Sequence, residues 1–369
     1  MQDNFSITAD HLSELLSAKD SGLIVIDVRP AEQRNEWYIP GSIHIDAYKD
    51  LNEGNMSVLD QVQVSDHTKV VTVCAAGRIS QIAADELRKR GVESYSLVGG
   101  MKAWSLAWNI AELSLKDIQL SVIQIRRTGK GCLSYLIASG TSAIIVDPSV
   151  DIEVYEHLLT ENKLQLHAVF ETHTHADHLS RACILADKFE AKLMLPAASK
   201  VVFPYSMIHD GDTLNLNTIS LRAIDTPGHT FNRTSYLLNG KVLFTGDTLF
   251  TDSIGRPDLK SSEEEAKVKS TVLFRSLKRL LTLSNDVIVL PSHTSKPAEF
   301  DGLVIQTTIG KAKKDIEIIR LEEEQFVNEI LKRIPPTPEN YLEIVKSNLA
   351  WNSILNTELE AGANRCAIN

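Results

Sequence analysis

The sequence has few cysteines, and their spacing is not that of a disulfide-bonded fold. None stands in a CxxC pair, and the four are scattered at Cys74, Cys132, Cys183 and Cys366. This argues against a disulfide scaffold and fits a reducing compartment. Any important cysteine is therefore expected to act singly.

The chain also lacks the features of several other protein classes. No apolar stretch approaches the roughly eighteen residues of a membrane span, and the N-terminus has neither a signal-peptide nor a transit-peptide pattern. The formal charge of -10 argues against broad binding of nucleic acid or of anionic membranes. We expect a cytoplasmic protein whose partners are small molecules, and homo-oligomer formation stays open.

What the chain does contain is enough length for two domains, since 369 residues exceed one average domain. In the first part, LIVID (23–27) and VVTV (70–73) are typical of buried strands, and helices are predicted over 9–18 and 79–91. This alternation predicts an α/β fold with a parallel sheet.

The second part opens with consecutive strand-like runs and is again mixed α and β. Segment 111–117 is the expected boundary, which gives domains of residues 1–112 and 113–369. The second domain is expected to end in a helical extension, in which the charge run 322–324 forms a solvated helix face and Trp351 lies in a helix.

The strongest chemical signal is THTHADHL (172–179), which follows the apolar end of a predicted strand. It brings together His173, His175, Asp177 and His178 on one loop. A single histidine is usually structural, but such clustering lets several side chains converge on one point in front of the strand.

Further candidate ligands recur downstream in the same setting. His229 follows the strand-like run SLRAI, Asp247 ends KVLFTGD and His293 ends DVIVLPSH. Each lies just past the carboxyl end of a predicted strand, where α/β folds gather their sites. Imidazole and carboxylate ligands without a thiolate suit zinc, iron or manganese.

The motifs HxHxDH (173–178), GH (228–229), GD (246–247) and SH (292–293) occur in the order of the metallo-β-lactamase superfamily, which the second part resembles. The resemblance implies an αββα sandwich over about residues 115–360. THTHADHL, TPGHT, FTGDTLF, GRPDL, TTIG and EEEQFV together are similar to the persulfide dioxygenases. This narrower resemblance implies one iron(II) per chain, held by His173, His229 and Asp247.

Such a two-histidine, one-carboxylate triad leaves positions open for a persulfide, such as glutathione persulfide, and for dioxygen. The sulfane sulfur supplies the electrons, and the expected products are sulfite and the free thiol. His175, Asp177, His178 and His293 would orient water and the iron ligands. Arg256, in GRPDL, is expected to contact a glutathione-like carboxylate or to be an exposed structural arginine.

Two alternatives stay open. If all seven residues bind metal, two zinc or iron ions would hydrolyse a thioester, as in glyoxalase II, and the cofactor would be Zn(II) at two per chain. The other alternative is a non-catalytic, sulfur-binding regulatory protein.

In the first part, Cys74 follows VVTV and starts the loop CAAGRIS before a predicted helix. Taken singly, such a cysteine is more often an inert core residue. Here we expect its sulfur among loop amides at the helix N-terminus beside Arg78, a setting that favours the thiolate and hence a persulfide.

The segments IDVRP (26–30), IPGSIHI (39–45) and LVGGMKAW (97–104) around this loop resemble rhodanese domains over about residues 5–110. The resemblance implies a sulfurtransferase with Cys74 as sulfur acceptor and with Gly77, Arg78 and Ser80 in the sulfur-binding loop. Ile79 stands where common rhodanese loops carry arginine. Fusion of the two parts would couple persulfide oxidation to the formation or use of thiosulfate.

Overall fold

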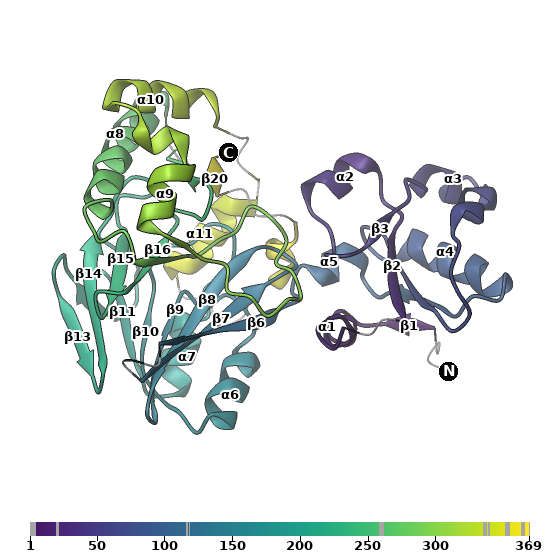
Figure 1. Ribbon diagram of the computed structural model, residues 1–369, viewed down its shortest axis with the longest axis horizontal. Helices are drawn as coiled ribbons and strands as arrows, with labels where there is room; N and C mark the ends of the chain where they lie inside the picture. Colours follow the sequence, from purple (N-terminus) through teal and green to yellow (C-terminus); the bar gives the residue numbers. More distant parts are fainter. Residues whose placement is uncertain are drawn as a thin grey trace.

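Two lobes with separate sheets make up the computed structural model of the chain (Figure 1). The structure describes residues 5–19, 22–115, 117, 119–257, 262–334, 338, 340–350, 355–362 and 366–368. Trp351, and Asp258 and Leu259 of the GRPDL motif, lie outside these residues. Of the helices in the described part, none combines the length and apolar character needed to cross a bilayer.

The smaller lobe is built on a parallel sheet of five strands in the order β1-β5-β4-β2-β3. The strands are β1 (Ser6–Ile7), β2 (Leu23–Asp27), β3 (Ile43–His44), β4 (Lys69–Val73) and β5 (Ser94–Leu97). The helices are α1 (Ala9–Ser17), α2 (Ala31–Glu36), α3 (Tyr48–Asn52), η1 (Met56–Gln61), α4 (Arg78–Lys89) and α5 (Gly100–Trp104). The predicted parallel sheet is confirmed, because both apolar runs form adjacent strands.

Local signals explain where the helices of this lobe begin and end. Thr8 caps α1 by accepting a hydrogen bond from the backbone N–H of His11 at 3.3 Å. Helix α4 carries two basic residues in its last turn, where they face the negative end of the helix dipole. Gly91 follows it with φ of +84°, a conformation that favours glycine and stops the helix.

The larger lobe contains two facing sheets. The first has the order β12-β11-β10-β9-β8-β7-β6, with β6 (Asn109–Leu115), β7 (Leu120–Arg127), β8 (Cys132–Ser139), β9 (Ser142–Val146), β10 (Gln165–Phe170), β11 (Lys192–Pro196) and β12 (Ser206–Ile208). The second has the order β13-β14-β15-β16-β18-β19, with β13 (Thr213–Leu216), β14 (Ile219–Asp225), β15 (Thr234–Leu238), β16 (Val242–Gly246), β18 (Ile288–Pro291) and β19 (Thr307–Thr308).

Helices cover both outer faces of this pair of sheets (Figure 1). On the first sheet lie α6 (Ile152–Glu161) and α7 (Ala182–Lys188). On the second lie α8 (Glu263–Leu280), α9 (Ile309–Asp315), η3 (Glu317–Arg320) and α10 (Glu323–Lys332). The expected αββα sandwich is therefore confirmed.

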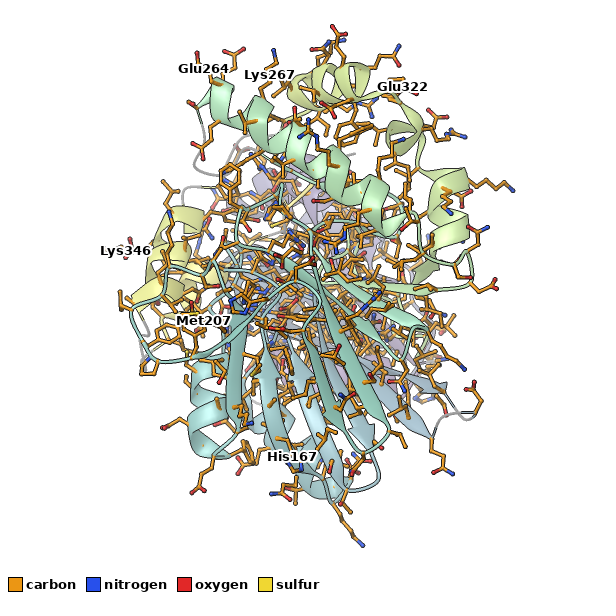
Figure 2. All side chains as sticks on the ribbon, turned by 90° about the vertical axis from the view of Figure 1, so that its left-hand side faces the viewer. His167, Met207, Glu264, Lys267, Glu322 and Lys346 are labelled. Atoms are coloured by element: carbon orange, nitrogen blue, oxygen red, sulfur yellow. The ribbon has the colours of Figure 1, made fainter. Side chains whose placement is uncertain are left out.

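The main core fills the space between the two sheets. Phe170 and Tyr135 from the first sheet meet Tyr236 and Phe244 from the second, with edge-to-face rings at centroid distances of 5.2 and 4.9 Å. Charged side chains such as Glu264, Lys267 and Glu322 are exposed, and Figure 2 shows them at the outer edge of the helical layer. His167 lies within β10.

The C-terminal segment returns across the larger lobe. It forms α11 (Asn340–Ala350), η4 (Thr357–Glu360) and β20 (Ala367–Ile368), and β20 pairs with the short strand β17 (Ile254–Gly255). The expected helical extension is thus only part of this segment, because its last residues form a strand.

The boundary between the domains needs correction. Strand β6 pairs with β7 along its whole length, so Asn109 already belongs to the sheet of the second lobe. The expected division between residues 112 and 113, within segment 111–117, falls inside this strand. A composition shift could not reveal this, because β6 has the alternating burial of an edge strand with one solvated face.

Trp37 of the first lobe packs against the second lobe. Its indole Nε1 donates to the carbonyl oxygen of Thr128 at 3.1 Å, and a Cβ added to Gly131 would lie 2.9 Å from its ring. Gly131 also has φ of +94°, so both its conformation and the packing require glycine. Because Gly131 precedes Cys132, the first lobe touches the residue next to the start of β8.

We expect Trp37→Ala to destabilise the protein by about 3–5 kcal/mol, because it removes a buried indole from the contact between the lobes. Thermal unfolding, followed by tryptophan fluorescence and calorimetry, would show a lower midpoint and separate transitions for the two lobes. Val202→Ala, at a side chain with 80% relative exposure, is the control and should change the stability by about 0.5 kcal/mol or less. Equal midpoints for the two variants would contradict this role of Trp37.

Candidate metal centre

The seven predicted ligands lie on four loops that follow strands of the two sheets. The loop 172–179 follows β10, His229 follows β14, Asp247 follows β16 and His293 follows β18. All seven side chains are buried, with relative exposure of 2% or less. The structure thus brings the predicted residues to one edge of the sandwich, where they form several groups, two of which are joined through Asp247 and His293.

The first group consists of His173, His229 and Asp247, whose ligand atoms lie within 4.8 Å of one another. Nε2 of each histidine is 3.7 Å from Oδ2 of Asp247. The Nε2 atom of His173 and the Oδ2 atom of Asp247 are buried and have no hydrogen-bond partner. Because unpaired buried polar atoms are costly, these atoms fit a site for a cation.

Neighbouring groups orient these three ligands. His229 Nδ1 lies 2.6 Å from the carbonyl oxygen of Arg256, to which it donates, so its Nε2 carries the lone pair. His173 Nδ1 lies 2.9 Å from Oγ1 of Thr172. Burial lowers the pKa of His229 to about 4 and that of His173 well below its ordinary value. Both imidazoles are therefore neutral at pH 7, the form that binds a metal.

Asp247 is held by His293, whose Nδ1 lies 2.5 Å from Oδ1. Burial disfavours the charged carboxylate, but His293 outweighs it and lowers the pKa of Asp247 to about 2. The second oxygen, Oδ2, remains directed toward the two histidines.

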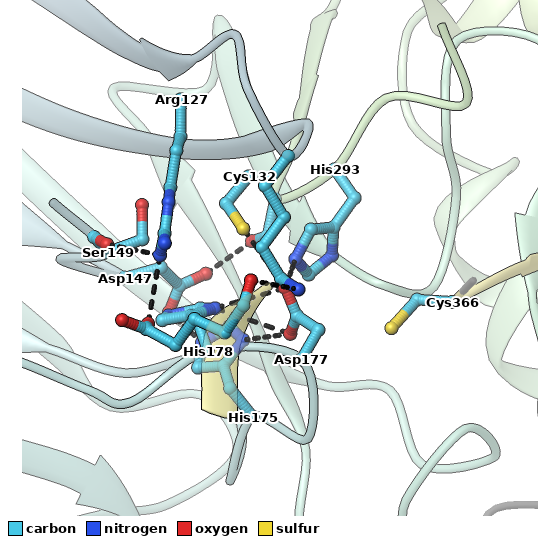
Figure 3. A network of polar contacts seen from close by, with 12 residues as sticks. Arg127, Cys132, Asp147, Ser149, His175, Asp177, His178, His293 and Cys366 are labelled. Carbon is cyan, nitrogen blue, oxygen red and sulfur yellow. Dashed lines mark hydrogen bonds and ion pairs between the residues drawn. The ribbon is translucent and has the colours of Figure 1, made fainter. Parts of the chain in front are cut away.

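The second group consists of Cys132, Asp177, His178 and His293 (Figure 3). Oδ2 of Asp177 accepts from Cys132 Sγ at 3.0 Å and lies 2.8 Å from His293 Nε2. His178 Nδ1 lies 3.2 Å from the same oxygen. Sequence reasoning missed Cys132, because a lone cysteine 45 positions before Asp177 carries no ligand motif.

In the third group, His175 faces two carboxylates, while the centroid of its ring lies 4.2 Å from that of His173 and 4.3 Å from that of His178. Its Nε2 lies 3.2 Å from Asp147 Oδ1 and 3.0 Å from Glu171 Oε2, and these three residues form a group of their own. Neither contact has the alignment of a hydrogen bond. Burial raises the pKa of Glu171 to about 7. The sequence did not mark Asp147 or Glu171, although both follow apolar strands.

The C-terminal segment is fixed against these groups by a buried ion-pair cluster. Glu360 Oε1 lies 2.9 Å from Arg127 Nη1 and 2.7 Å from Arg181 Nη1, and all three side chains are at most 1% exposed. Lys130 Nζ donates to the carbonyl oxygen of Glu360 at 2.9 Å. No sequence motif links these residues, since Glu360 lies 233 positions after Arg127.

The same segment places a thiol beside the centre. Cys366 is buried, and its sulfur forms a group with Asp247 and His293. Its carbonyl oxygen accepts from the N–H of Arg256 at 3.0 Å. Figure 3 shows Cys366 and Cys132 on opposite sides of His293.

The side chain of Arg256 is fully buried, so the alternative of an exposed structural arginine is wrong. Its backbone contacts His229 and Cys366, which sequence reasoning did not foresee. Contact of its side chain with a glutathione-like carboxylate stays a prediction.

A pocket lies beside the centre. Glu171, His173 and His175 line one part of it, and Asn348 of α11 lines another. Asn348 Nδ2 also donates to the carbonyl oxygens of His175 and His178, at 2.9 Å each, so α11 holds the histidine loop in place. Much of the remaining wall is apolar, as is usual for small-molecule sites.

In the first lobe, the sulfur of Cys74 is buried at the N-terminus of α4. It accepts from the N–H of Gly77 at 3.1 Å and from Oγ of Ser80 at 3.3 Å. The expected loop donors are thus present at the sulfur. Arg78 instead donates to Oδ1 of Asn52 at 2.7 Å, and Ile79 is a buried core residue.

Comparisons with known proteins agree with this division of the chain. Residues 8–107 match the rhodanese-like domain family, and residues 127–293 match the metallo-beta-lactamase superfamily. The chain therefore joins a rhodanese-like domain to a metallo-beta-lactamase domain.

Solved structures resemble the larger lobe. ETHE1 from Myxococcus xanthus is 26% identical with a TM-score of 0.55, over 62% of this chain and 98% of that chain, which supports the resemblance that the sequence motifs carry. A metallo-beta-lactamase from Staphylococcus aureus subsp. aureus COL is 24% identical with a TM-score of 0.55, over 68% of this chain and 74% of that chain. The second likeness bears on the fold alone.

Among curated relatives, hydroxyacylglutathione hydrolase from Prochlorococcus marinus (strain MIT 9301) is 30% identical over 164 residues. The same enzyme from Francisella tularensis subsp. novicida (strain U112) is 30% identical over 161 residues. These matches cover 43% of this chain and 63% and 61% of the relatives, so the chain spans less than two thirds of either relative.

We expect Glu360→Gln to cost about 3–5 kcal/mol at pH 7, because it leaves Arg127 and Arg181 buried without a carboxylate. Burial opposes ionisation of Glu360, but the two arginines outweigh it and hold its pKa well below the ordinary 4.5. A carboxyl with a lowered folded pKa contributes stability above its unfolded pKa and loses it as pH falls toward the folded pKa. The variant should therefore lose less stability than the wild type between about pH 5 and 3.

Urea unfolding at several pH values measures both effects. Glu358→Gln is the matched control, because the Glu358 side chain is 73% exposed and pairs with Lys102 at the surface. It should cost about 0–1 kcal/mol. A Glu360→Gln variant as stable as this control would show that the buried cluster does not hold the segment.

Proposed function

We propose that the second domain is an iron(II)-dependent persulfide dioxygenase that oxidises glutathione persulfide to sulfite and glutathione. The observation that carries this proposal is the convergence of His173, His229 and Asp247 within 4.8 Å of one another, with Nε2 of His175 facing other carboxylates. Two imidazoles and one carboxylate are the ligand set of mononuclear non-haem iron sites that keep positions open for substrate and dioxygen.

Iron(II) bound at this triad would supply activation of dioxygen next to the persulfide sulfur. The protein orients the three ligand side chains through contacts with Thr172, Arg256 and His293. It also excludes bulk water, because the three ligand side chains are buried. Because the ligands are fixed, the persulfide and dioxygen would be held side by side, and their bimolecular reaction would become effectively unimolecular.

The overall reaction balances without another reductant. One persulfide, one dioxygen and one water give one thiol, one sulfite and two protons. The S–S bond breaks, the terminal sulfur loses four electrons, and dioxygen accepts these four. A glutathione-based substrate is supported by the relatives named hydroxyacylglutathione hydrolase.

The first domain is proposed to transfer sulfur through a persulfide on Cys74. The donors from Gly77 and Ser80 support this role, because they can stabilise negative charge on the sulfur. Sulfite formed in the second domain would accept this sulfur to give thiosulfate, or the reverse reaction would supply persulfide from thiosulfate.

A second candidate is a dinuclear thioester hydrolase, with two Zn(II) per chain and a glutathione thioester as substrate. It is favoured by the hydroxyacylglutathione hydrolase relatives and by the second group around Asp177. Asp147 and Glu171 occupy the surroundings of His175 Nε2, so a second metal would need the other ring nitrogen, Nδ1, which is buried without a hydrogen-bond partner.

Metal analysis with paired assays separates the two candidates. We expect one iron(II) at the triad and oxygen uptake on glutathione persulfide, with both lost in His173→Ala and His229→Ala. Thr172→Val, which removes the hydroxyl beside His173, should weaken iron binding by about 10- to 100-fold. Hydrolysis of S-lactoylglutathione without oxygen uptake would overturn the dioxygenase proposal.

For the first domain, we expect Cys74→Ser to abolish thiosulfate formation while oxygen uptake continues. The reason is that serine cannot carry the sulfane sulfur. Cys183→Ser is the control, since this cysteine is partly exposed and lies on α7. Sulfur transfer at the wild-type rate in Cys74→Ser would mean that Cys74 is only structural.

A further inference from the structure

We propose that Arg233 is a positioning residue of the iron triad, because its buried guanidinium supplies a fixed positive charge beside the three ligands. The residue is 2% exposed, and neither the sequence motifs nor the proposed reaction gives it a role. Its charge would set how tightly the triad holds a cation and would favour iron(II) over iron(III). The second effect rests on the proposed dioxygenase, whereas the first does not.

The guanidinium of Arg233 lies against residues that lead to two of the ligands. Its Nη2 atom donates to the carbonyl oxygen of Thr245 at 3.0 Å, in the strand that leads to Asp247. A Cβ added to Gly246 would lie 2.4 Å from the same Nη2 atom and 2.6 Å from Oγ1 of Thr172, the first residue of the histidine loop. The charge is therefore held next to the end of β16 and the start of the histidine loop.

The backbone around Arg233 joins it to the loops that carry the two histidines of the triad. Its carbonyl oxygen accepts from the N–H of Thr226 at 3.0 Å, in the loop that leads to His229. The N–H of the next residue, Thr234, donates to the carbonyl oxygen of Thr172 at 2.9 Å. A residue that is bonded in this way to the loops of the ligands is preorganised to act on them.

The charge of Arg233 has no local counterpart. Its Nε and Nη1 atoms are buried and have no hydrogen-bond partner in the part of the chain that the structure describes. Two other buried arginines, Arg127 and Arg181, share the carboxylate of Glu360. Because a buried charge without such a partner is costly, the position of Arg233 favours a role for the charge itself.

The positive charge of Arg233 acts on the ligands of the triad. Burial lowers the pKa of Arg233 to about 10, against the opposing effect of Asp247 and Asp147, so the side chain stays protonated at pH 7. Burial is also the largest cause of the lowered pKa of His173 and of His229, and the charge of Arg233 adds to both shifts. A positive charge that disfavours a proton on an imidazole also disfavours a metal cation there.

The effect of the guanidinium depends on the charge of the bound ion. Repulsion between two cations grows with the charge of each, so Arg233 would destabilise iron(III) more than iron(II). It would therefore favour the ferrous state, which non-haem oxygenases with this ligand set use. Groups outside the ligand set commonly tune a metal centre in this way.

The zinc affinity of the metal-free, full-length chain tests the effect on cation binding. The zinc ion that the wild type binds and His173→Ala does not bind is the ion at the triad. Arg233→Met removes the charge but keeps a long side chain, and it should bind this ion about 10- to 100-fold more tightly. Unchanged or weaker binding would overturn the proposal, because a residue that only supports the loops would weaken binding when it is lost.

Two further variants serve as controls for the charge. Arg233→Lys keeps the positive charge, and Arg222→Met removes an exposed arginine from β14. Both should bind the zinc ion at the triad as the wild type does. Tighter or weaker binding in Arg233→Lys would overturn the proposal, so the test stays decisive if Arg233→Met does not fold.

The reduction potential of the iron-loaded chain is a second readout, which a purely structural role would not order by charge. Redox titration should show a lower iron(III)/iron(II) potential in Arg233→Met and the wild-type potential in Arg233→Lys and Arg222→Met. Equal potentials in Arg233→Met and the wild type would refute the effect on the oxidation state.

Oxygen uptake on glutathione persulfide reports on the dioxygenase separately. If the wild type takes up no oxygen while the zinc affinities follow the expected order, the dioxygenase is refuted and the role of Arg233 in cation binding stands. Oxygen uptake together with equal zinc affinities in Arg233→Met and the wild type would refute the role of Arg233 and leave the dioxygenase in place.

Discussion

Charged groups that are buried need partners of opposite charge or a metal, and Asp247, which is fully buried at the centre, depends on this requirement. One of its oxygens contacts His293, while the other faces His173 and His229 without a hydrogen bond. The carboxylate therefore joins the two groups of ligands. The loops that follow β10, β14, β16 and β18 must all meet around it, and the two sheets that carry these strands are arranged to allow this.

The same requirement explains the C-terminal segment. Glu360 is buried between Arg127 and Arg181, so the C-terminal segment is bound to the end of β7 and to the residue before α7. From this anchor the chain runs to β20 and places Cys366 beside Asp247 and His293. The segment thus forms part of the wall of the centre.

The loop between β7 and β8 also connects the two domains. Its Thr128 and Gly131 contact Trp37 of the rhodanese-like domain, and Cys132 follows directly. Gly131, which contacts the first domain, and Cys132, which belongs to the second ligand group, are therefore adjacent in the chain. Trp37 thus packs next to the start of β8, where Cys132 is paired with His293.

Much of this protein was predictable from its sequence. Apolar runs marked the strands, helix signals marked α1 and α4, and the HxHxDH, GH, GD and SH motifs marked the five histidines and two of the aspartates that converge on the centre, but not Asp147. These predictions succeed because they depend on local periodicity and on the position of a residue after a strand. The prediction for the domain boundary failed at β6, because the membership of an edge strand is decided by its partner β7 and not by its own composition.

The sequence by itself determined the two folds, the residues that follow the strands and the kind of ligands that they offer. Only the tertiary structure decided that His175 belongs with Asp147 and Glu171, that Cys132 joins Asp177, and that Glu360 and Cys366 come back to the centre. The physical reason is that these pairings join segments far apart in the chain. Which buried charge meets which partner depends on how the sheets pack and where the last residues lie.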